Sequence, residues 1–448
     1  MEKKNTLLLI AAIGTTVLTV FDHFYYLGIL EGDFFADFCT YTNIASNLLF
    51  GWFFLMLYSR SAKGSVLKDA SIMGVVAAIF WIVSSITINY IIYHSMSSDD
   101  PDPIQTRQKL LSFWYIFLST PGNAIFIVAS LRLAIAYSRN LLISIGGWIY
   151  SVTEIIYILL FTFGLQYPLS KLIGIEYYEF DSWFMDLNKF YSYMLTLGNI
   201  ASCLMLFGLL LKGEWKEKVT GPVKTPVWAY LFYYAGVIAL SYAFVHWSKD
   251  WYFDNSWYKL HFGIFTALPL FAMAIVALVF GRLFVIYQQG KETVRKMTEA
   301  GVPQKRDILS NNHITFFILS VILLLIGILL LADEDHKMEE IDLIYTFGIF
   351  ACSASLLLLG AIATINSKVR NYLDEDKSMN STVICYLFGY LIIAAAIIFT
   401  LIKVIDFDGS DMAWYAFGCI SAAGVPVGLS LLCAGYLFKY RDNLKSLE

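Results

Sequence analysis

The chain has 448 residues, of which 58% are hydrophobic and only 15% charged, and its mean hydropathy is +0.65. In soluble domains about a quarter of the residues are charged. The composition of this chain therefore excludes a soluble domain and predicts a protein embedded in a bilayer. The formal net charge of -4 is the sum of basic loops on one side of the membrane and acidic loops on the other. Because it reflects this division, it gives no sign of a nucleic-acid partner, and we expect none. The six cysteines show no CxxC spacing, which argues against a disulfide framework or a zinc site.

Twelve apolar stretches follow one another along the chain. Each is long enough to cross a hydrocarbon core of ~30 Å as a helix, and in lipid only a helix satisfies the backbone within one segment. The predicted fold class is therefore an all-α polytopic membrane protein with about 12 transmembrane helices. The stretches cover residues 7–29, 40–58, 70–94, 112–137, 142–166, 185–211, 227–247, 260–287, 313–332, 342–365, 381–404 and 412–438.

Loop charges predict the orientation of these helices. Most of the 31 Lys and Arg residues fall at the two termini and on alternate loops, and cationic residues stay on the cytoplasmic side. Both termini are therefore expected in the cytoplasm. The first stretch ends in TVLTVFDHF, which lacks a small-residue cleavage pattern, so we interpret it as an uncleaved helix.

A shift of about 222 residues aligns the two halves of the chain and places His23 on His246. This predicts two tandem six-helix repeats in the same orientation, related by an axis along the membrane normal. The predicted divisions are a repeat with a polar interior at 1–212, a cytoplasmic Gly/Pro-containing linker at 213–226, and a repeat with an apolar interior at 227–448.

Polar residues inside the apolar stretches occur in the first half of the chain. Such residues are costly in a membrane and usually face a bundle interior or a cavity. We therefore place any binding site in the N-terminal repeat. The residues concerned are Asn43, Asn47, Asn89, Asn123, Glu154 and Asn199.

The second stretch begins with a row of polar side chains. Thr40, Asn43 and Asn47 are spaced i, i+3 and i+7, so on a helix they share one face, with Ser46 beside them. Because that face would not suit lipid, we expect Thr40, Asn43 and Asn47 to contact the polar part of a bound molecule.

Two further features of the N-terminal half predict site residues. Glu154 lies near the middle of the fifth stretch, where it is either a neutral acid bonded to Ser151 or to an amide of a neighbouring helix, or part of a proton-linked step. The fourth stretch contains Pro121, which removes a backbone donor and breaks the helix near a cavity. We expect three side chains around this break to face the same molecule, namely Ser119, Thr120 and Asn123.

Histidines at the outer helix ends are weak candidates for a metal site. His23 follows Asp22, and His94 closes the third stretch, but neither of these two histidines belongs to an HxxxH or HxxE spacing. We therefore expect no bound metal and no cofactor.

Three segments in order are FCTYTNIASNLLFGWFFLMLY, AIFWIVSSITINYIIYH and QYPLSKLIG. Over roughly residues 5 to 210 the chain resembles the androgen-induced family of membrane threonine hydrolases and its bacterial six-helix relatives. The resemblance implies a lipid-ester hydrolase in which Thr40 would be the nucleophile and a histidine of the fourth helix the base. Here the run before Pro121 reads YIFLSTP and has no histidine.

These observations favour a protein of a bacterial plasma membrane that binds or transports a small amphipathic or lipid-like molecule through an outward-facing cavity in the N-terminal half. Membrane lipids are the expected surroundings. The first alternative is a threonine-dependent lipid ester hydrolase. The second is a scaffold or signalling subunit with a cytoplasmic partner at the 288–312 loop, which contains KETVRKMTEAGVPQKR.

Overall fold

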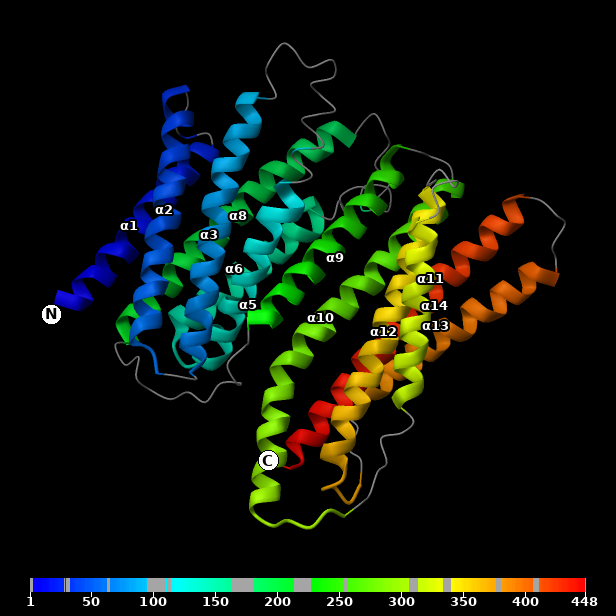
Figure 1. Ribbon diagram of the computed structural model, residues 1–448. Helices are drawn as coiled ribbons and strands as arrows, with labels where there is room; N and C mark the ends of the chain where they lie inside the picture. Colours follow the sequence, from blue (N-terminus) through cyan, green and yellow to red (C-terminus); the bar gives the residue numbers. More distant parts are fainter. Residues whose placement is uncertain are drawn as a thin grey trace. The chain divides into compact units, whose positions relative to one another are not determined.

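The computed structural model describes residues 3–27, 29, 33–62, 65–94, 110, 114–162, 169, 180–212, 227–253, 257–305, 313–332, 340–375, 380–405 and 411–447. These residues form twelve helices and no strand, and each of the twelve predicted stretches coincides with one helix (Figure 1). The all-helical fold class is thus confirmed for the described part of the chain.

The first six helices occupy residues 3 to 212. Two of them contain a π-helical turn, with η1 (Tyr115–Ser119) leading into α5 and η2 (Ile158–Thr162) extending α6. The α-helical parts are α1 (Lys3–Tyr26), α2 (Asp33–Arg60), α3 (Val66–His94), α5 (Thr120–Ala136), α6 (Leu141–Tyr157) and α8 (Phe180–Lys212).

The other six helices are on average longer than their apolar stretches. The difference is greatest for α10, which was expected to end at 287 and continues to Glu299. Its added turns, QQGKETVRKMTE, are mostly charged and polar and mostly exposed, while Gly290 and Val294 pack toward the core of unit 2. Residues 288–299 are therefore helical and do not belong to the loop predicted at 288–312. The helices are α9 (Val227–Phe253), α10 (Trp257–Glu299), α11 (Ile314–Ala332), α12 (Glu340–Arg370), α13 (Asn380–Ile405) and α14 (Asp411–Lys445).

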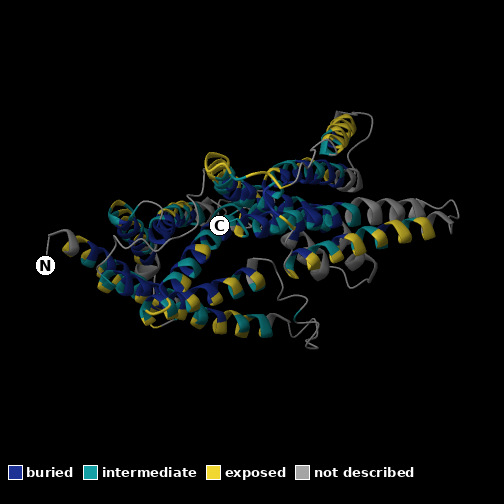
Figure 2. Cartoon of the chain, turned by 90° about the horizontal axis from the view of Figure 1, so that it is seen from below, coloured by how far each residue is buried: buried dark blue, intermediate teal, exposed yellow. Residues whose placement is uncertain are grey.

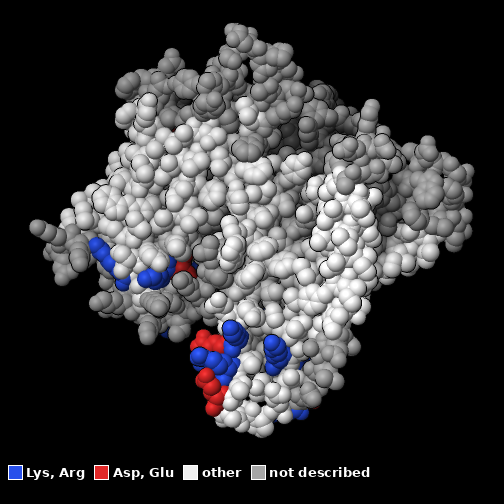
Figure 3. Space-filling model, viewed as in Figure 1, with Lys and Arg blue, Asp and Glu red and all other residues white. Residues whose placement is uncertain are grey.

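Nine helices in the described part of the chain are long and apolar enough to cross a membrane, so this is an integral membrane protein. They are all except α2, α9 and α14; α2 carries the amides discussed below, and α9 and α14 have undescribed side chains over part of their length. Exposed residues run along outer helix faces, and buried residues face neighbouring helices (Figure 2). Most of the described surface in Figure 3 is uncharged.

The chain divides into two compact units, Met1–Lys224 (unit 1) and Thr225–Glu448 (unit 2). In unit 2 the core lies between α10, α12 and α14, where Leu358, Cys433 and Tyr440 are fully or almost fully buried. In unit 1 the helices pack in the order α1–α2–α3–α5–α6–α8, and α8 returns to α1. The predicted linker at 213–226 lies outside the described residues.

Two adjacent glycines let α6 approach α5 and α8 at the same level. A Cβ on Gly146 would lie 2.5 Å from the carbonyl oxygen of Ala201 on α8, and one on Gly147 would lie 2.7 Å from that of Ser130 on α5. Helices in lipid gain little from the hydrophobic effect, and small residues stabilise them by permitting close contact. These glycines fix the distance between α6 and its two neighbours.

We predict that Gly147→Leu destabilises unit 1 by about 1 to 3 kcal/mol, because the side chain has backbone rather than flexible atoms in its way. Thermal unfolding of the detergent-solubilised protein measures the effect. Val152→Leu, on the exposed face of the same helix, is the matched control and should leave the midpoint unchanged. Equal midpoints for the two variants would contradict the tight α5–α6 contact.

Candidate functional site

The polar residues of α2 face two different neighbouring helices. Asn47 donates from Nδ2 to Asn43 Oδ1 at 3.0 Å, and Ser85 of α3 donates from Oγ to the same oxygen at 2.7 Å. Ser46 instead lies toward α1, where its hydroxyl is 2.9 Å from that of Thr19. The side chain of Thr40 lies outside the described residues, so its predicted contact with the amides stays a prediction.

A second set of hydrogen bonds connects α3 to α5 and α6. Trp81 of α3 donates from Nε1 to Asn123 Oδ1 at 2.7 Å, and Asn123 donates from Nδ2 to Glu154 Oε2 at 2.9 Å. On α3, Ser85 lies one turn from Trp81, and its Oγ is 2.8 Å from the Trp81 carbonyl oxygen. We call the six side chains of both sets the polar chain, and they are Asn43, Asn47, Ser85, Trp81, Asn123 and Glu154.

Glu154 is 3% exposed, and no described cationic side chain forms a salt bridge with it. Of the two hydrogen-bond partners considered from the sequence, the structure shows the neighbouring amide, since Asn123 donates to the carboxyl group. Ser151 bonds elsewhere, with its hydroxyl 2.8 Å from that of Ser130 on α5. A charged group at mid-bilayer costs about 2.5 to 3.5 kcal/mol on insertion scales, so burying Glu154 in its ionised form among membrane helices is costly.

Aromatic rings pack against the polar chain on one side. The Trp81 ring centroid is 5.4 Å from those of both Phe50 and Phe126, and Phe126 in turn lies 4.8 Å from Tyr150. Tyr150 is one helical turn before Glu154. The polar groups are therefore bordered by apolar aromatic surface contributed by α2, α3, α5 and α6.

The predicted break in the fourth helix is present as a π-helical turn, Tyr115–Ser119, directly before Pro121. Such turns occur frequently at functional sites. Ser119 and Thr120 are both buried, and the Thr120 hydroxyl has no hydrogen-bond partner among the described residues. They lie within about one turn of Asn123, but neither is bonded to the polar chain.

A separate buried cluster joins α1 to α2 and α8. The Thr42 hydroxyl donates to the Asp22 carboxylate, while His23 turns the other way, with Nδ1 3.2 Å from Thr196 Oγ1 and Nε2 2.9 Å from Asn199 Nδ2. Over the described residues no three His, Cys, Asp or Glu side chains are grouped to hold a metal ion. The side chain of His94, the other weak metal candidate, lies outside that part.

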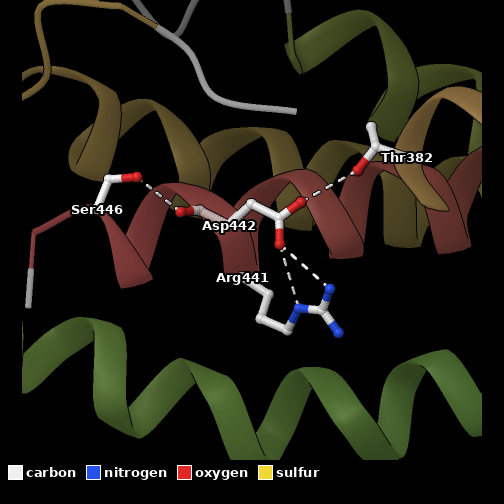
Figure 4. Close-up of polar contacts among 4 residues, drawn as sticks. All are labelled: Thr382, Arg441, Asp442 and Ser446. Carbon is white, nitrogen blue, oxygen red and sulfur yellow. Dashed lines mark hydrogen bonds and ion pairs between the residues drawn. The ribbon is translucent and has the colours of Figure 1, made fainter. Parts of the chain in front are cut away.

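Unit 2 contains a buried polar cluster that the sequence analysis did not predict (Figure 4). Arg441 donates from Nη2 to Asp442 Oδ1 at 3.2 Å, and Thr382 of α13 approaches Asp442 Oδ2 at 3.5 Å. Next to it, Asn443 donates from Nδ2 to Asn366 Oδ1 of α12 at 3.0 Å. These residues were missed because the apolar stretch was ended at 438, although α14 continues as a helix to Lys445.

Comparisons with protein-family models, curated proteins and solved structures found no match to this chain. The resemblance to membrane threonine hydrolases therefore rests on the sequence motifs alone. The class of protein defined by the fold and the polar chain is a multi-pass helical membrane protein with a buried carboxyl group hydrogen-bonded between helices.

We predict that Asn123→Ala and Glu154→Ala are not additive, because each removes the partner of the other. A double-mutant cycle on the free energy of unfolding should give a coupling of about 0.5 to 3 kcal/mol. Glu154→Ala combined with Asn366→Ala of unit 2 is the control, with no shared partner, and should be additive. A coupling near zero for the first pair would show that the Asn123–Glu154 bond does not form.

We further predict that Asp442→Ala destabilises unit 2 by about 1 to 3 kcal/mol, since it leaves Arg441 without its acceptor in a mostly buried site. Asp374→Ala is the matched control, because Asp374 pairs with Lys305 at an exposed position. Its effect should stay within about 1 kcal/mol. Chemical unfolding of the two variants measures both values, and the reverse order would contradict the burial of Asp442.

Proposed function

We propose that unit 1 binds a small amphipathic or lipid-like molecule in an outward-facing cavity and transports it across the membrane. The observation that supports this most is the polar chain, which places amides from two helices, an indole N–H and a carboxyl group among membrane helices. Polar side chains in membrane helices either bond helices together or face a cavity, and an ionisable residue among them marks a candidate substrate path. Because the polar chain includes the carboxyl group of Glu154, we assign it to recognition of a polar head group.

The exposure of the side chains supports a ligand contact rather than a closed core. Asn43, Asn47 and Asn123 are partly exposed, so each amide keeps room for a further partner. Each of these amides carries two donors and one acceptor, and the observed bonds do not use all of them. Among the aromatic rings beside them, Trp81 is partly exposed and would offer apolar surface to a tail, whereas Phe50, Phe126 and Tyr150 are buried. Ser119 and Thr120 complete the proposed binding surface beside Asn123.

Glu154 would couple binding to movement through its protonation. Its carboxyl group has one described hydrogen-bond partner, Asn123, and Asn123 is held by Trp81 of a third helix. A change of charge at Glu154 would therefore alter the hydrogen bonds that connect α3, α5 and α6. The proposal includes twelve spans as two same-orientation repeats with cytoplasmic termini, in accordance with the loop charges.

The test is mass spectrometry of molecules that copurify with the wild type and with the double variant Asn47→Ala, Glu154→Gln. We expect one species to be enriched with the wild type and depleted at least about tenfold with the variant, which corresponds to ~1.4 kcal/mol of binding free energy. Ser130→Ala, Ser151→Ala is the matched control, because that bond also joins α5 to α6 but lies outside the polar chain.

The same bulk lipids with wild type, variant and control would overturn the proposal. The amides would then serve to pack helices.

A further inference from the structure

The interior of the four helices that carry the polar chain has a single formal charge. Within residues 41–59, 70–88, 114–131 and 141–160 the sequence contains one residue of the Asp, Glu, Lys, Arg and His types, and it is Glu154. The nearest charged residues of these helices, such as Asp69 and Arg132, lie several turns away along the chain. The polar chain thus has one acidic group and no basic group of its own.

A site with one acidic group and no basic group binds anionic, cationic and neutral head groups with different free energies. An anionic head group would meet the Glu154 carboxylate without a cation to offset the repulsion, in surroundings that screen charge poorly. A cationic head group would form an ion pair with the same carboxylate, and the site as a whole would stay neutral. A neutral head group would gain hydrogen bonds only.

The aromatic rings favour the same ligand class. Indole, phenyl and phenol faces attract cations, and aromatic groups recognise quaternary ammonium ligands in this way. Trp81, Phe126 and Tyr150 are joined in one cluster that borders Asn123 and Glu154, and Trp81 is its partly exposed member, whereas Phe126 and Tyr150 are buried. A carboxyl group beside a partly exposed indole and partly exposed amides matches an amine or quaternary ammonium group attached to an apolar tail.

The other buried acid of unit 1 does not offer the same arrangement. Asp22 accepts from Thr42, and the neighbouring imidazole of His23 is bonded to α8, so this cluster contains a basic group next to its acid. Asp22 therefore provides a control position, with similar burial and a different neighbourhood.

We infer that the polar chain selects cationic amphiphiles, with Glu154 as the counter-ion of a positively charged amine or quaternary ammonium head group. This inference rests on the proposed function of unit 1 and adds the charge of its ligand.

The experiment is equilibrium dialysis of three radiolabelled amphiphiles with the same eight-carbon tail, each below its micellar concentration. They are octyltrimethylammonium, octyl glucoside and octyl sulfate, and the full-length protein is kept in a nonionic maltoside detergent. Empty micelles correct for partitioning. We expect wild type to bind the cation at least about tenfold more tightly than the glucoside, and the sulfate no more than empty micelles do.

Glu154→Gln keeps an acceptor for Asn123 and removes the charge. It should lose at least about tenfold in affinity for the cation and keep its affinity for the glucoside within about twofold. Glu154→Asp, which keeps the charge, and Asp22→Asn, which removes the other acid, should both retain the preference for the cation. Thermal unfolding of each variant verifies that it is folded. If Glu154→Gln does not fold, the binding of the three amphiphiles to the wild type still decides the charge preference.

The outcomes separate the two proposals. Equal binding of cation and glucoside by wild type, a preference for the sulfate, or unchanged cation affinity in Glu154→Gln overturns the cationic selectivity and leaves the binding function in place. Loss of the preference in Asp22→Asn alone overturns the assignment to Glu154. Binding of none of the three above empty micelles overturns both proposals.

Discussion

The close approach of α6 to its two neighbours is the constraint on which the arrangement of unit 1 depends. Gly146 and Gly147 allow carbonyl oxygens of α8 and α5 to come where a side chain would otherwise stand. The same short α5–α6 distance lets Asn123 reach Glu154 about two turns further along α6. A slightly wider spacing would leave the carboxyl group without this partner, in lipid-like surroundings where an unpaired polar group is costly.

The polar chain shows how such groups are accommodated among membrane helices. Asn123 serves as both acceptor and donor, because it accepts from Trp81 and donates to Glu154, whereas Asn43 accepts from both Asn47 and Ser85. Because the Trp81–Asn123 and Asn123–Glu154 bonds each join two helices, they also fix the rotation of α3, α5 and α6 about their axes. The functional groups and the packing of unit 1 therefore depend on the same contacts, and a change in one is transmitted to the other.

Several of these features could be predicted from the sequence, for identifiable reasons. The helices followed from apolar length, because lipid allows few alternatives to a helix. The burial of Glu154 followed from its isolation in an apolar stretch, whereas the sequence left its partner open between Ser151 and an amide of a neighbouring helix, and the packing of α5 on α6 selects Asn123. The ends of α10 and α14 did not follow from apolar length, because both helices continue through charged and polar turns, where hydropathy no longer indicates a helix. The separation of Ser46 from Asn43 and Asn47 depends on which neighbours flank α2, and this is a property of tertiary structure.

The length of α10 has a mechanical consequence. Its 43 residues extend over roughly 64 Å at ~1.5 Å per residue, about twice the thickness of a hydrocarbon core. Pro269 lies near its first third and leaves one carbonyl without its helical donor, so bending is easiest there. The remaining turns act as a lever of roughly 45 Å, and a tilt of about 5° at Pro269 would displace Glu299 by about 4 Å. A small rearrangement inside the bilayer would thus become a large displacement at the charged end of the helix.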